Sequence, residues 1–387
     1  MSSFLTLFAA SRIKPSEEIN SVYITSAPYF LQSARKGGSL TSSIGASKSG
    51  NSPNAMSPIL TNYFTKFAAK VLHNMDRTPI LEKYNPLGQL FIFIGLVLLS
   101  LVIGVILSAA VIAVMMGTEA IGSNVMSDLS NPNVLATLKT SQLVASITIF
   151  ILPALLFACL ASRDVFRSLS INKKVDSRSI ILVVILVIAV LPIVNFTQEI
   201  NQLMVLPDWL SGIEEWMKTQ EENSEVVVKA FLSSTGLLAL FGNLVVMALI
   251  PAIGEELCFR GVMQNIFGKM FQNPHIAIWV TAAIFSAIHM QFYGFIPRML
   301  LGALLGYLYL WSGSLWLAIL AHFLNNGFAV FMAYLIGIGS MSSDIEEIGA
   351  GEGMWFVVIS SMLFSGSLLF GIWKNEHLKK VEITSVD

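Results

Sequence analysis

Long apolar runs separated by short polar segments dominate the chain from residue 88 onward. Most runs approach the roughly 20 residues that a helix needs to cross a bilayer. No strict alternation of apolar and polar residues competes with this helical pattern. We therefore expect an all-α, polytopic membrane protein with about eight transmembrane helices. The expected spans cover residues 88–116, 141–161, 178–196, 236–257, 276–290, 296–311, 315–338 and 354–373.

The segments outside these runs differ in character. Residues 1–57 include a stretch rich in Ser, Gly, Asn and Ala, so we expect a disordered N-terminal tail there. Residues 58–86 begin with apolar side chains on one helical face and lysines nearby, which predicts an amphipathic juxtamembrane segment. The transmembrane domain is expected over 87–374, followed by a cytoplasmic tail over 375–387. In the longest connection, residues 196–235, Trp and Leu at helical spacing predict an outer interfacial helix that acts as a partial lid.

Composition narrows the class of protein further. Of the 387 residues, 55% are hydrophobic and only 12% are charged, whereas soluble domains carry about 25% charged residues. The net charge of −1 provides no basic face for a nucleic acid. The partners expected are the lipid bilayer and a peptide or membrane-protein substrate, with no nucleic acid.

The charges in the connecting segments predict an orientation. Lys and Arg gather before the first expected span, between the second and third, and after the eighth, whereas the opposite loops are acidic or neutral. By the positive-inside rule, the basic segments are cytoplasmic. With eight spans, both termini would lie in the cytoplasm, in a pattern that suits the plasma (inner) membrane of a bacterium.

Two adjacent glutamates, Glu255 and Glu256, lie within an apolar run. An ionisable group at membrane depth costs roughly 2.5–3.5 kcal/mol, and two neighbouring carboxylates resist joint ionisation. The pair therefore indicates either chemistry or a structural ion pair between helices. Because Glu256 and Arg260 are four residues apart, they share a helix face and can pair. Glu255 points about 100° away and is free to act as a base, near a kink expected at Pro251.

Further polar side chains lie on neighbouring expected helices. His289 ends one apolar run, and His322 shares a helix face with Asn326 four residues later. A turn expected near residues 272–274 would bring Glu255 and His289 to similar depths. Together they supply a base, a second polar group for water, and two donors for an oxyanion, which is what amide hydrolysis requires.

A metal site is the rival interpretation of the same residues. Glu255, His289 and His322 match the ligand count of some zinc hydrolases. No H-E-x-x-H string occurs in the chain. Its absence weakens the zinc interpretation, which nevertheless stays open.

Three strings in order, Glu255-Glu256 with Arg260, Phe285 with His289, and His322 with Asn326, carry a family resemblance. They are similar to the E-E-x-x-x-R, F-x-x-x-H and H-x-x-x-N motifs of the CAAX prenyl endopeptidase and bacteriocin-processing family (CPBP, also called Abi). The resemblance covers about residues 236–330 and implies an intramembrane endopeptidase.

The resemblance also implies roles for the residues. Glu255 would activate water with His289, and His322 and Asn326 would stabilise the oxyanion. Glu256, Arg260 and Phe285 would support the site. This mechanism requires no cofactor, although members of the family were first classed as metalloendopeptidases, so that zinc remains an alternative.

Two other function classes compete with a protease. One is a non-proteolytic membrane scaffold or immunity factor on the same fold, and the other is a transporter with an intramembrane carboxylate pair. The intact motif residues favour the protease over the scaffold. The transporter is disfavoured because no internal repeat is visible.

Overall fold

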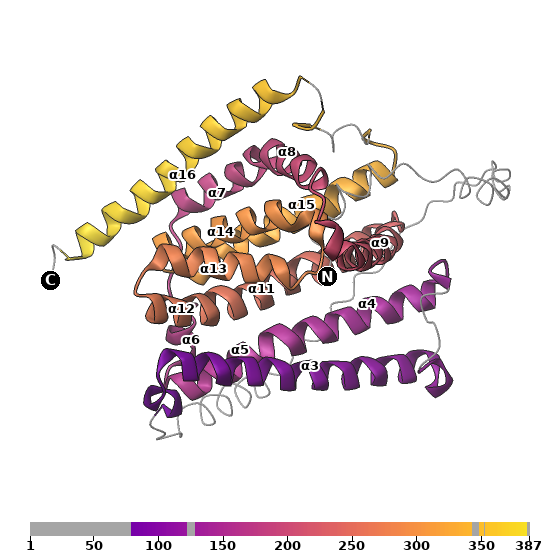
Figure 1. Ribbon diagram of the computed structural model, residues 1–387, viewed down its shortest axis with the longest axis horizontal. Helices are drawn as coiled ribbons and strands as arrows, with labels where there is room; N and C mark the ends of the chain where they lie inside the picture. The colour runs from indigo at the N-terminus through magenta and orange to yellow at the C-terminus, as the bar shows by residue number, and fades with distance from the viewer. Residues whose placement is uncertain (1–78, 122–127, 343–347, 352, 385–387) are drawn as a thin grey trace, which may run out of the picture. The chain divides into compact units, whose positions relative to one another are not determined.

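Helices make up all the regular structure in residues 79–121, 128–342, 348–351 and 353–384, which are the parts of the chain that the computed structural model describes, with side chains up to residue 378 (Figure 1). No strand occurs among these residues, so the all-α prediction is confirmed. The expected N-terminal tail over 1–57 and most of the expected amphipathic segment over 58–86 lie outside the described residues.

Within the described residues, six helical stretches are long and apolar enough to cross a membrane. They are α3 (Pro86–Met116); α4, η5 and α5 (Pro132–Ser146, Ile147–Ile151 and Leu152–Ala161); α10, η7, α11, η8 and α12 (Leu237–Asn243, Leu244–Leu249, Ile250–Glu256, Leu257–Met263 and Gln264–Phe271); η9 and α14 (Phe292–Gly294 and Phe295–Ser312); α15 (Leu315–Gly337); and α16 (Trp355–Thr384). The remaining elements are η2 (Ile80–Lys83), η3 (Thr118–Ala120), α6 (Val165–Ser168), α7 (Ser177–Ala189), α8 (Leu191–Gln202), η6 (Asp208–Leu210), α9 (Ser211–Leu232) and α13 (Pro274–Ala287).

The chain is thus a multi-pass membrane protein, and each predicted apolar run corresponds to helix. The predicted count of eight spans is not confirmed. Helices α7 and α8 meet at a bend of 42° and supply a seventh span only if they are taken together. Helix α13 has 14 residues, or about 21 Å at 1.5 Å per residue, which is shorter than the apolar thickness of a bilayer.

The helix that carries the glutamate pair is continuous over 35 residues, Leu237–Phe271. Two of its segments, η7 and η8, are π-helical. Pro251 is the second residue after η7 and lies in the first turn of α11. Because proline lacks an N–H and clashes with the carbonyl of the preceding turn, the π-helical register before it lets the helix continue. The chain therefore passes Pro251 within one span, with a change of register at the predicted kink.

A glycine sets how closely this helix approaches its neighbour. A Cβ at Gly254 would lie 2.9 Å from Cβ of Phe150 in η5. One turn later, the Cys258 thiol donates a hydrogen bond of 3.1 Å to the carbonyl of Phe150. Helix α11 and segment η8 are thereby fixed against η5, and the Glu255 position between these contacts is rigidly held.

The turn predicted after this helix is confirmed. Gln272 adopts a left-handed conformation at φ 52° and ends α12. The Asn273 side chain then accepts hydrogen bonds from the backbone N–H groups of His275 and Ile276 and caps α13. Helices α12, α13, α14 and α15 follow as neighbours, with α13 packed on both α12 and α14 (Figure 1). This packing places polar residues of separate helices close together in space.

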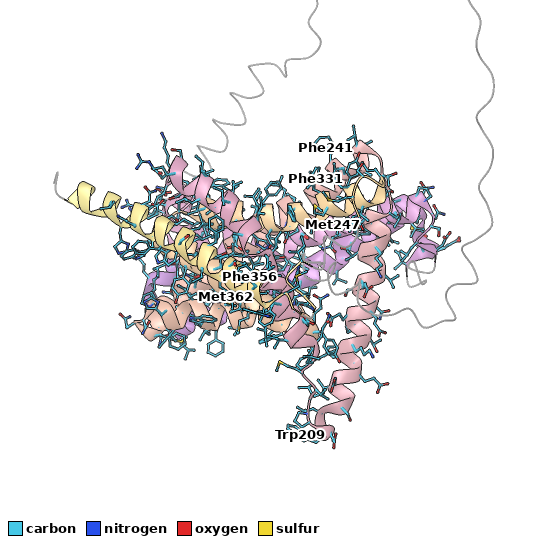
Figure 2. All side chains as sticks on the ribbon, turned by 90° about the horizontal axis from the view of Figure 1, so that it is seen from above. Trp209, Phe241, Met247, Phe331, Phe356 and Met362 are labelled. Atoms are coloured by element: carbon cyan, nitrogen blue, oxygen red, sulfur yellow. The ribbon has the colours of Figure 1, made fainter. Side chains whose placement is uncertain are left out.

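Helix α9 is the outer helix predicted in the connection between residues 196 and 235. Figure 2 shows Trp209 just before its outer end, where the side chain is 81% exposed. The Tyr293 hydroxyl donates to Glu214 of α9 at 3.2 Å. The inner half of α9 lines a cavity at the core helices, as expected of a partial lid.

Candidate active site

Glu256 and Arg260 form a fully buried ion pair. Arg260 Nη1 donates to Glu256 Oε1 at 2.7 Å, and Nη2 donates to the Gly302 carbonyl of α14 at 2.7 Å. The guanidinium also lies 4.9 Å from the centre of the Phe285 ring, within range of a cation–π interaction. The pairing predicted from the four-residue spacing is confirmed, and Arg260 also joins the pair to α13 and α14.

His322 of α15 lies between the two glutamates. Its Nδ1 is 2.8 Å from Glu256 Oε1, and its Nε2 is 3.8 Å from Glu255 Oε2. Because the Glu256 oxygen also accepts from Arg260, the proton of this hydrogen bond belongs to His322 Nδ1. In neutral His322, Nε2 therefore carries a lone pair directed towards Glu255.

Asn326 lies one turn beyond His322 and is 4% exposed. Its Oδ1 accepts a hydrogen bond from Asn325 Nδ2 at 3.1 Å, and its own Nδ2 is 3.5 Å from the Met247 carbonyl. The first contact fixes the orientation of the amide, so Asn326 presents N–H donors on its other side. Asn326 can thus donate to a group that enters the cavity.

His289 lies just beyond the C-terminal end of α13. Its Nδ1 donates to the Phe285 carbonyl at 2.7 Å, because that oxygen can only accept. Nε2 is therefore the nitrogen that can accept a proton or hold a water molecule. The Phe285 ring is 5.0 Å from the His289 ring and 6.1 Å from the His322 ring, so Phe285 separates and orients the two imidazoles.

A cavity of about 280 Å³ joins these side chains. Five predicted site residues line it: Glu255, Phe285, His289, His322 and Asn326. Glu256 and Arg260 lie behind its wall, where they hold His322 and Phe285. The structure therefore brings together all the residues that the sequence singled out, from three different helical stretches.

Arg298 of α14 also lines this cavity, although it was not among the predicted site residues. Its side chain is 1% exposed, and Nη2 donates to Gln291 Oε1 in the segment between α13 and α14. The available signal was its charge, since Arg298 is one of only five Asp, Glu, Lys or Arg residues between 236 and 339. A cation buried at this depth is a functional feature by default.

The donor chemistry of the cavity is compatible with zinc, because a carboxylate and two imidazole Nε2 atoms are ligands of that metal. Each imidazole is also oriented through its Nδ1, as metal-binding histidines usually are. However, among the described residues no group of three or more His, Cys, Asp or Glu side chains lies close enough to hold a metal ion.

The region around the candidate site is similar to a known protein family. Residues 237–328 match the family model described as type II CAAX prenyl endopeptidase Rce1-like, which confirms the resemblance given by the three motifs. The chain is also 33% identical over 93 residues to the uncharacterized protein YpbD of Bacillus subtilis, a match that covers 23% of this chain and 43% of that relative. No solved structure matches the chain. The family match covers the helices around the candidate site, and the chain spans less than half the length of that relative.

Proposed function

We propose that this protein is an intramembrane endopeptidase in which Glu255 activates water to hydrolyse a peptide bond of a membrane-associated or peptide substrate. The observation that carries the proposal is the meeting of Glu255, His289, His322 and Asn326 in one cavity. Charged and polar side chains such as these lie mostly on the exposed surface of proteins. Here they converge from separate helices among apolar walls, and the family match of residues 237–328 supports the same chemistry.

The division of labour between the glutamates follows from their contacts. Glu256 Oε1 already accepts from both Arg260 and His322, so it is committed to structure. Glu255 Oε2 lies 3.8 Å from His322 Nε2, which is beyond hydrogen-bonding distance, so Glu255 is not committed in the same way. Glu255 therefore takes a proton from water while the water oxygen attacks the peptide carbonyl carbon. His289 accepts the second hydrogen of that water at Nε2 and orients it.

The attack converts the carbonyl oxygen to an oxyanion. Asn326 Nδ2 donates to it directly. His322 can donate from Nε2 only as an imidazolium, since Nδ1–H is occupied by Glu256. When the tetrahedral intermediate collapses, the C–N bond breaks and the proton held by Glu255 passes to the leaving amine. No cofactor is required in this scheme, and the zinc-dependent version remains its alternative.

The charges of the connecting segments support a membrane location and an orientation. We propose that the protein lies in the plasma membrane of a bacterium, with both termini in the cytoplasm. A non-proteolytic scaffold or immunity factor would use the same fold without turnover. The Nδ1 contacts of His289 and His322 favour an enzyme, because a scaffold has no need to orient two imidazole Nε2 atoms towards one cavity.

The test is cleavage of fluorogenic peptides by the purified protein in lipid nanodiscs, including S-prenylated peptides that end in C-a-a-X. Glu255→Gln should lose at least about 10²-fold in kcat, whereas the exposed Glu119→Gln should behave as wild type. Turnover that requires stoichiometric zinc, lost on chelation and restored by zinc, would favour the metal version. A folded protein that cleaves no peptide in any of these sets would favour the scaffold.

A further inference from the structure

His289 lies in the connection between α13 and α14, where the backbone adopts an unfavourable conformation. We call residues 288–296, which include η9 and the first two residues of α14, the His289 segment. Met290 in this segment has a left-handed conformation, at φ 55°. That conformation is disfavoured for residues with a Cβ and persists where the surroundings enforce it. Because the Met290 side chain is 43% exposed, its own packing provides little of this support.

Two buried side chains of α8 supply support from outside the segment. Asn201 is 1% exposed, and its Nδ2 donates to the Phe292 carbonyl at 2.9 Å while its Oδ1 accepts from the Ile296 N–H at 2.7 Å. Gln198 shares a helix face with Asn201, since the two are three residues apart. Its Nε2 donates to the Tyr293 carbonyl at 2.7 Å. One amide of α8 thus joins η9 to the start of α14, and a second holds the turn between them.

The other contacts of the segment come from the two helices that it connects. Ser286 Oγ of α13 donates to the Phe295 carbonyl at 2.6 Å, and Arg298 of α14 donates to Gln291. By contrast, Asn201 lies 91 positions before its partner Phe292 and outside the family match over 237–328. The α8 amides therefore tie the His289 segment to a separate part of the fold.

We propose that Asn201 is a positioning residue for His289, assisted by Gln198. Its contacts hold the backbone on which the His289 ring is mounted, so that Nε2 stays directed towards the water that Glu255 activates. The inference rests on the proposed function and deepens it. Without these contacts Met290 would be free to leave the left-handed region, and His289 would shift in the cavity. A displacement of about 1 Å at a catalytic group can cost about 10²-fold in rate.

The test compares peptide cleavage in nanodiscs by Asn201→Ala and by Asn195→Ala. Asn195 is the matched control, because it is another buried amide of α8, 5% exposed, and donates to the Ile348 carbonyl at 2.8 Å in a different connection of the chain. Asn201→Ala should lower kcat by about 10- to 100-fold and change KM by less than about twofold. Asn195→Ala should keep kcat within about twofold. Equal losses of kcat in the two variants would overturn the proposal.

A rescue tests whether the effect passes through the backbone at Met290. Glycine adopts the left-handed conformation without steric cost. Adding Met290→Gly to Asn201→Ala should therefore restore kcat by about fivefold or more, which a general loss of stability in α8 would not allow. If Asn201→Ala does not fold, Gln198→Ala removes one hydrogen bond to the same segment, and it should lose about 3- to 10-fold in kcat with the same rescue. A loss that Met290→Gly leaves unchanged would contradict the proposal.

Amide hydrogen exchange separates this inference from the proposed function. Exchange within the His289 segment should be about 10-fold faster or more in Asn201→Ala, and Asn195→Ala should leave it at the wild-type rate. Faster exchange in a protein that cleaves no peptide as wild type would reject the protease and retain Asn201 as the support of this segment. Cleavage by wild type, with exchange in the segment unchanged by Asn201→Ala, would retain the protease and overturn the role of Asn201.

Discussion

Removal of the Arg260 guanidinium tests whether the Glu256–Arg260 pair stabilises the core. In Arg260→Met, the apolar stem is largely kept and the charge is lost. Glu256 is 0% exposed, so its carboxylate would lose its ion-pair partner without gaining water. Breaking one side of a buried pair costs about 3–5 kcal/mol. The Gly302 carbonyl would also lose a donor at 2.7 Å, so we expect the upper part of this range.

The assay is equilibrium unfolding in mixed micelles, followed by the fluorescence of the seven tryptophans. Arg163→Met provides the control, because Arg163 is exposed and surface substitutions usually change stability by less than about 0.5 kcal/mol. Glu256→Gln combined with Arg260→Met should be less destabilised than the sum of the two single variants, since the double variant buries no lone charge. A loss below about 1 kcal/mol for Arg260→Met would contradict the reasoning, because it would mean that Glu256 is neutral or reached by water.

Three further predictions follow from other contacts. His322→Ala and Asn326→Ala should each lower kcat by about 10²–10³, and the double variant should be little worse than the poorer single one if they act as a unit; additive losses in peptide cleavage would show separate roles. Gly254→Ala should lose about 1–3 kcal/mol in the same unfolding assay because its Cβ would lie 2.9 Å from a neighbouring Cβ, whereas Gly268→Ala, which meets no atom within 4 Å, should be neutral or stabilising. Burial raises the pKa of Glu221 above its ordinary value, so the folded state favours the protonated carboxyl. The stability of α9 is therefore fully present below the ordinary pKa and declines as the pH rises through the raised pKa. Amide exchange of α9, corrected for intrinsic rates, should show that decline in wild type and not in Glu221→Gln.

Local spacing predicted much of the site because helical geometry is regular. The ion pair of Glu256 with Arg260 depends only on a four-residue interval within one helix, and the predicted turn at residues 272–274 depends only on capping chemistry. The contact of His322 with Glu256 joins residues 66 positions apart. It depends on how α15 is rotated against α11, which apolar patterns on membrane helices do not specify because both the lipid-facing and the protein-facing sides are apolar. For that reason the sequence indicated that Glu256 was occupied but could not show that it also holds His322.

The span count was harder to predict for a related reason. An apolar run defines hydrophobicity, whereas a span also needs length along one axis. Helix α13 ends at Ala287 before the run does, and the chain then turns so that His289 enters the cavity. Arg298 was overlooked because a single arginine near the start of an apolar run is commonly an interfacial charge. Its burial on the cavity appears only once α13 and α14 are packed together.

The proposed chemistry places one further demand on His322. Its Nδ1–H is held by Glu256, so Nε2 needs a proton before it can donate to an oxyanion. Glu255 Oε2 is 3.8 Å from that nitrogen and acquires a proton when it activates water. A closure of about 1 Å would form a hydrogen bond of ordinary length and let the proton be shared. Glu255 and His322 would then be coupled. The proton that Glu255 takes from water would allow His322 Nε2 to donate to the oxyanion that forms when the water attacks. The fixed carboxylate of Glu256 makes this possible, because it stabilises the imidazolium from the side opposite to the substrate.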